Sequence, residues 1–173
     1  PDRLAQQLRP MSQDSRLWVL GTAMISIDGS GRRRRPWHVP TGSDGVRAGL
    51  ERWCCIGHPS CMMRRQSILA IGGYRPAYEA AEDYDLFLRA SEHGKVDNLE
   101  AVGVLYRMHG ESVSQRQALR QAISVDLARA THRLRVEGRP DPTVDLAAPP
   151  DLEDPIVTAL LSPAQMKYHR AMA

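Results

Sequence analysis

The sequence predicts an α/β fold, because it contains both segments with the apolar spacing of helices and short segments with strand character. Of its 173 residues, 42% are hydrophobic and 25% are charged, which is ordinary for a globular protein with a core. No stretch reaches the roughly 18 consecutive apolar residues of a membrane span. The three cysteines, crowded between Cys54 and Cys61, do not suit a disulfide framework and indicate a reducing compartment.

The first part of the chain predicts a helix followed by two short strands. Apolar residues fall at helical spacing at Leu4, Leu8 and Met11. Residues 17–20 and 24–27 have strand character, and Asp-Gly-Ser-Gly at 28–31 favours a turn after the second strand. The four arginines 32–35 follow. We expect them in a solvated loop, with binding of nucleic acid or of an anionic membrane surface as the alternative.

The middle of the chain predicts helices that are closed by glycines. A helix is expected from Ser43 to near Cys54, with one apolar face formed by Val46, Leu50 and Trp53. Residues 60–64 have strand length, and residues 65–71 predict a short helix before a pair of glycines.

The clearest helix of the sequence is predicted at residues 82–93. Its first turn is acidic, its apolar residues form one stripe, and Gly94 ends the pattern. Two short strands are expected after it, at residues 96–99 and 102–106. A predicted helix between segments of strand character supports the mixed α/β interpretation.

The C-terminal third predicts a long helix, a linker and a short helix. Ser114 and Gln117 resemble a capping box that opens the long helix, and Gly138 ends it. Residues 139–161 begin with a proline-rich stretch and predict an extended linker, and residues 162–173 predict a short amphipathic helix. We expect this tail to serve docking or assembly, the alternative being that it packs across the core.

Four short motifs lie in order between residues 58 and 114: Arg-Arg, Gly-Gly-Tyr, Glu-Asp-Tyr-Asp-Leu and Tyr-Arg-x-His. With this order and spacing, the block closely resembles the acceptor side of bacterial family 2 glycosyltransferases, which have a GT-A fold. Pro-Asp-Arg-Leu at 1–4 and the predicted hairpin at 21–31 extend the resemblance upstream. The resemblance implies that residues 1–138 form the C-terminal half of a GT-A domain, with a mixed sheet and flanking helices.

The nucleotide-binding half of that family, with its metal-binding Asp-x-Asp motif, does not occur in this sequence, and Asp83-Tyr84-Asp85 does not replace it because it lies in the acceptor-side motif. We therefore expect a piece of a longer polypeptide that does not bind the donor by itself. The resemblance implies an inverting transfer of a sugar from a nucleotide-diphosphate donor to a glycan or lipid-linked acceptor, with Mg or Mn, in polysaccharide or envelope glycan synthesis. It also implies a cytoplasmic protein, associated with the inner face of the membrane, without a nucleic-acid partner. The alternative is a non-enzymatic module or inactive remnant that docks on an anionic partner.

Asp83 is the candidate catalytic residue. An inverting transfer needs an ionised carboxylate within hydrogen-bond reach of the acceptor hydroxyl, and a helix N-terminus keeps a carboxylate charged. The resemblance implies that Asp83 is this base and that Glu82 binds acceptor hydroxyls or orients the site. The alternative is that both carboxylates only complement the helix dipole.

Four further residues are site candidates by the same resemblance. Gly72 and Gly73 would let the backbone approach donor and acceptor, although a helix cap also explains them. His109 would join the metal ligands, the alternative being an ordinary surface histidine. Arg107 would neutralise phosphate or pack at a strand end. A zinc site formed by the three cysteines and His58 is disfavoured, because the spacing does not match a Cys-x-x-Cys knuckle.

Overall fold

The computed structural model describes residues 2–108 and 117–173, which group into two compact units. The first unit holds residues 2–73 and 89–108 of the described chain, and the second unit holds residues 74–88 and 117–173. The fold is α/β, with a mixed four-stranded sheet and flanking helices. This much of the predicted fold class is confirmed.

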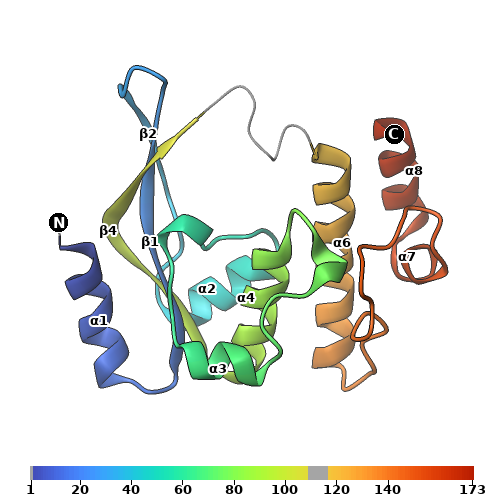
Figure 1. Ribbon diagram of the computed structural model, residues 1–173, viewed down its shortest axis with the longest axis horizontal. Helices are drawn as coiled ribbons and strands as arrows, with labels where there is room; N and C mark the ends of the chain where they lie inside the picture. Colours follow the sequence, from blue (N-terminus) through green and yellow to red (C-terminus); the bar gives the residue numbers. More distant parts are fainter. Residues whose placement is uncertain (1, 109–116) are drawn as a thin grey trace. The chain divides into compact units, whose positions relative to one another are not determined.

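The sheet belongs to the first unit and is built around β1 (Leu17–Ile27). β4 (Lys95–Arg107) pairs with β1 in parallel along its length. β2 (Arg33–Trp37) and β3 (Met62–Met63) pair with β1 in the antiparallel direction, β2 near its C-terminal end and β3 near its N-terminal part. In Figure 1, the turn between β1 and β2 and the C-terminal end of β4 therefore lie at the same end of the sheet.

Two pairs of predicted strands are in fact single strands. The segments 17–20 and 24–27 join into β1, because the residues between them are small and need no turn. The segments 96–99 and 102–106 join into β4 through a bulge: Leu99 pairs with Thr22 and Val102 with Ala23, so that two residues of β4 are left over. The first unit therefore has fewer and longer strands than the sequence pattern suggested.

The prediction that the four arginines occupy a loop is wrong for most of them. Residues 33–37 form β2, every residue of which is exposed. The turn at 28–31 returns the chain along β1, with Ile27 opposite Arg33 and Met24 opposite Trp37. Once the turn has set this register, backbone pairing with β1 makes a strand despite the charged side chains.

Helix α1 (Arg3–Gln13) buries a different face from the predicted one. Met11 is buried with Leu17 and Leu20, but the companion of Met11 inside is Gln7. The Gln7 side-chain amide donates hydrogen bonds to the backbone oxygens of Leu20 and Ser60, at 2.6 and 2.8 Å. Leu4 and Leu8 are 63% and 60% exposed, so the apolar stripe was misleading.

The other short elements of the first unit follow the predicted order. Helix α2 (Ser43–Leu50) starts after Gly42 rather than being capped by Ser43 and ends before the predicted position, which leaves Trp53 exposed. Of the strand expected at 60–64, the two residues of β3 are found. Ser60 ends the 3₁₀ turn η1 (His58–Ser60) instead. Helix α3 (Arg65–Ala70) is confirmed.

Helix α4 (Glu82–His93) has the predicted bounds and contributes residues to both units. Its apolar stripe is buried, since Leu86, Phe87 and Ala90 have no exposed surface. The reason for glycine after the helix is steric, because a Cβ at Gly94 would lie 2.5 Å from the Trp18 ring.

The second unit is helical. It contains the 3₁₀ turn η2 (Pro76–Tyr78), α6 (Ala118–Val136), α7 (Pro155–Leu160) and α8 (Pro163–Met172). Its core brings Ile123 of α6 together with Val157, Leu161 and Met166. α8 opens with a complete capping box, whereas the Ser114 capping box predicted for α6 lies outside the described residues.

The segment after Gly138 is not an extended linker. Asp141 and Thr143 are buried, and Leu152 packs against the core of the second unit. The tail therefore packs on the second unit and is not peripheral to its core, because α7 and α8 supply core residues. Whether residues 1–138, 139–161 and 162–173 differ in function stays a prediction.

Candidate active site

The predicted catalytic pair stands at the first turn of α4, in the second unit. Glu82 and Asp83 are both half-buried, and one Asp83 carboxylate oxygen accepts a hydrogen bond from the Tyr84 backbone N–H at 2.7 Å. The positive end of the helix dipole stabilises negative charge at this position. Both carboxylates thus have the partial exposure that a group acting on an external hydroxyl requires.

A pocket of about 640 Å³ lies beside Glu82 within the second unit. Its lining includes Tyr74, which is 45% exposed, and the polar side chains of Glu79, Glu82 and Gln117. Carboxylates and an amide can bind hydroxyl groups, and an exposed aromatic ring offers an apolar face. Asp83 follows Glu82 on the helix but is not among the described lining residues.

The turn that leads into α4 holds a strained residue. Ala80 has a φ of 67°, in the left-handed region that costs a residue with a Cβ about 1–2 kcal/mol. Side chains of α6 hold this turn: Gln121 donates to the Ala80 backbone oxygen at 3.0 Å, and Ser124 donates to the Glu79 backbone oxygen at 2.8 Å. The start of α4, and with it Glu82, is therefore fixed by α6.

A buried charge network lies directly behind the first turn of α4. The Arg75 guanidinium binds both carboxylate oxygens of Asp85, and it also donates to Asp141 at 2.9 Å. Arg135 donates to the same Asp141 oxygen at 2.6 Å. The side chains of Asp85 and Asp141 are 0% and 4% exposed, so this network is inside the protein.

Tyr78 completes the network and ties it to α6. Its ring lies under the Arg75 guanidinium at 4.6 Å, and its hydroxyl is 2.8 Å from the Thr131 hydroxyl and 2.7 Å from the Thr143 hydroxyl. Burial, followed by the charge of Asp85, raises the pKa of Tyr78. Tyr78 therefore stays neutral, and its hydroxyl links Thr131 of α6 to Thr143 through hydrogen bonds.

The Asp141 carboxylate of the network is held ionised. Burial acts to raise the pKa of Asp141, but hydrogen bonds from Thr143 and Arg75 outweigh it and lower this pKa to about 2. For Arg75, burial acts to lower the pKa, but the hydrogen bond and charge of Asp85 raise it overall. The network is thus a set of paired charges that supports α4, and nothing in the sequence spacing of 75, 85 and 141 could have indicated it.

The two candidate glycines form the C-terminal cap of α3, in the first unit. Gly72 and Gly73 have φ values of 86° and 64°, and their N–H groups donate to the backbone oxygens of Leu69 and Ile68 at 3.0 Å. Arg89 then donates to the Gly73 backbone oxygen at 2.6 Å. The cap interpretation is confirmed, and a role in ligand approach stays a prediction, for which the open space around both Cα atoms leaves room.

Arg107 lies elsewhere in the first unit, at the end of β4. Its guanidinium donates to the backbone oxygens of Asp28 and Gly29 at 2.8 and 2.9 Å, and so fixes the turn between β1 and β2. In Figure 1, this turn and α3 are at opposite ends of the sheet, so the structure does not bring Arg107 together with Gly72 and Gly73. The phosphate role of Arg107 stays a prediction.

The predicted metal ligand His109 lies outside the described residues. Over residues 2–108 and 117–173, no group of three or more His, Cys, Asp or Glu side chains is arranged to hold a metal ion. The cysteine cluster is unsuited to zinc for a further reason. Burial raises the pKa of the Cys55 thiol to about 11, which disfavours the thiolate that a metal requires.

Comparisons with known proteins assign no family, since no family model and no curated protein sequence matches the chain. In the described part of the chain, the helices are too short or too polar to cross a bilayer. The functional argument therefore depends on the residues and geometry given above.

Proposed function

We propose that this chain is the acceptor-binding part of an inverting, nucleotide-sugar-dependent glycosyltransferase of GT-A fold. The observation that carries the proposal is the pocket beside Glu82, at the acidic first turn of α4, in which a few polar side chains stand in a largely apolar lining. A sugar presents hydroxyls to the Glu79, Glu82 and Gln117 side chains and an apolar face to the Tyr74 ring. The pocket composition suits such a polyhydroxylated ligand.

Asp83 acts in this proposal as the general base. It takes the proton of the acceptor hydroxyl while that oxygen attacks the anomeric carbon and the nucleoside diphosphate leaves. Because Asp83 lies next to Glu82 but outside the pocket lining, the acceptor extends from the pocket over the first turn of α4. The buried Arg75 network keeps this turn in place beneath the substrate.

Acceptor binding can be tested on the chain itself. Saturation-transfer NMR with a panel of mono- and disaccharides should show contact for at least one sugar, and Glu82→Gln should weaken that sugar's binding about tenfold, the value of one charge-assisted hydrogen bond. Glu100→Gln is the matched control, because Glu100 is an exposed carboxylate of β4 in the first unit. No contact with any sugar, or equal effects of the two substitutions, would contradict the proposal.

A further inference from the structure

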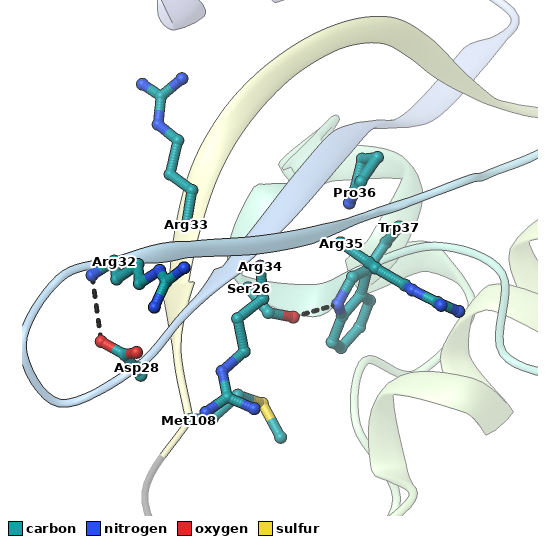
Figure 2. Close-up of a pocket in the computed structure, with 9 residues that line it drawn as sticks. All are labelled: Ser26, Asp28, Arg32, Arg33, Arg34, Arg35, Pro36, Trp37 and Met108. Atoms are coloured by element: carbon teal, nitrogen blue, oxygen red, sulfur yellow. Dashed lines mark hydrogen bonds between the residues drawn. The ribbon is translucent and has the colours of Figure 1, made fainter.

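Arginine side chains line a second pocket, at the β1–β2 hairpin of the first unit. The pocket has a volume of about 860 Å³ and includes all four arginines 32–35, with Ser26, Asp28, Trp37 and Met108. Figure 2 shows the Arg32 and Arg34 side chains on the same side of β2 as Asp28 and Met108, whereas Arg33 points away from them. This alternation is that of a strand, in which residues i and i+2 share a face.

None of the four guanidinium groups makes a hydrogen bond or a salt bridge to a described residue, and the one charge interaction is a longer-range one between Arg34 and Asp28. The carboxylate in the pocket, Asp28, is already occupied, because its Oδ1 accepts from the Ser30 N–H, the Ser30 hydroxyl and the Arg32 N–H at 2.6–3.1 Å. These hydrogen bonds, with the charge of Arg34, lower the pKa of Asp28, so that it caps the turn as an anion.

The frame of the pocket is fixed even though the arginines are free. Trp37 donates from its indole nitrogen to the Ser26 hydroxyl at 2.6 Å, and its ring packs against Tyr106 with centroids 5.4 Å apart. Arg107 fixes the turn from the other side through its two backbone hydrogen bonds. Because the backbone frame is already fixed, binding of an anion has to order only the arginine side chains and not the hairpin itself.

We propose that this pocket binds a phosphate or diphosphate group, with Arg32 and Arg34 as its principal ligands. The guanidinium fork matches the oxygens of a phosphate, and two such forks on one side of the hairpin, Arg32 just before β2 and Arg34 within it, suit a group with more than one negative charge. Nucleic acid fits less well, because single strands are bound by several aromatic rings on which successive bases stack, and the described lining of this pocket offers one aromatic ring, that of Trp37. The site is independent of the proposed acceptor pocket.

The phosphate group can belong to a soluble molecule or to a lipid headgroup, and two experiments separate these sources. The first is calorimetric titration of the chain with inorganic pyrophosphate at low salt and without metal. The second is flotation with vesicles of phosphatidylglycerol and phosphatidylcholine against vesicles of phosphatidylcholine alone. A soluble ligand predicts saturable pyrophosphate binding, and a headgroup predicts flotation that requires the anionic lipid.

In either case, Arg32→Gln with Arg34→Gln should weaken binding at least tenfold, and Arg33→Gln should have a smaller effect. Arg9→Gln is the matched control, since Arg9 is an exposed arginine of α1. Circular dichroism of each variant should match the wild type, because the replaced side chains are exposed. The proposal is overturned if neither pyrophosphate nor anionic vesicles bind, or if Arg9→Gln weakens binding as much as the double substitution.

Discussion

Two groups of arginine side chains, one in each unit, occupy opposite environments. In the second unit, Arg75 is 12% exposed and is paired with two buried carboxylates, those of Asp85 and Asp141. In the first unit, arginines 32–35 are exposed and none of them has such a partner in the described chain. The same side chain therefore supports the fold where its counter-charge is internal, and is available for a ligand where the counter-charge must come from outside.

The largest effect is expected when the internal pair is broken. Arg75→Met leaves the buried Asp85 carboxylate without its main partner, and we expect the free energy of unfolding to fall by about 3–5 kcal/mol. Urea denaturation measures this change, with Arg9→Met as the control. A loss below about 1 kcal/mol would show that the network does not support the fold, because that is the size of an exposed ion pair.

The same network should make stability depend on pH. The pKa of Asp141 is about 2 in the folded chain, against an ordinary value of 3.8, so its stabilisation is present above pH 3.8 and is lost as the pH falls toward 2. Asp141→Asn removes this contribution. We expect the stability difference between wild type and variant to shrink across this range, as measured by urea denaturation at several pH values. A difference that is constant with pH would contradict the assignment.

The external arginines should contribute little to stability. Arg32→Gln with Arg34→Gln alters exposed side chains that make no hydrogen bond or salt bridge to a described residue, so the free energy of unfolding should change by no more than about 0.5 kcal/mol. Thermal and urea denaturation both measure it. A loss of several times that size would remove the contrast between the two units.

Nucleotide sugars should show no manganese-dependent binding to this chain. The nucleotide-binding half of the proposed family, with its metal-binding Asp-x-Asp, does not occur in the sequence, since Asp83-Tyr84-Asp85 belongs to the acceptor-side motif, and the described residues hold no cluster that could replace it. Titration with common nucleotide sugars, with and without Mn, tests this. Any binding through the diphosphate should be independent of metal and lost in the Arg32 and Arg34 double variant. Micromolar binding that requires Mn would contradict the prediction.

The elements that the sequence predicted well are those with strong local signals. Helix α4 combines an acidic first turn, an apolar stripe and a glycine stop, and its bounds were predicted correctly. The prediction failed where contacts with another element decided the structure. Residues 33–37 form β2 because their backbone pairs with that of β1. Helix α1 buries Gln7 because the side-chain amide donates hydrogen bonds to two backbone oxygens of other elements.

The candidate site divides in the same way. Glu82 and Asp83 could be found because they are adjacent at a helix start, whereas Arg75 and Asp141 meet through the fold alone, 66 residues apart. The arginines 32–35 were visible as a charge run, but their placement on one strand beside Trp37 and Met108 depends on the hairpin register. The sequence showed where charged side chains cluster, and the structure showed which of them have hydrogen-bond or ion-pair partners inside the protein.

The most direct test of the central claim is the turnover of Asp83→Asn in a polypeptide that joins this chain to the nucleotide-binding half that the proposed function requires. The substitution keeps the shape of the side chain and removes the base. We expect kcat to fall about 10²- to 10⁴-fold, the usual contribution of a general base, with acceptor KM and melting temperature unchanged. Turnover within a few-fold of the wild type, in a folded variant, would show that Asp83 is not the base and that its place at the start of α4 serves the helix alone.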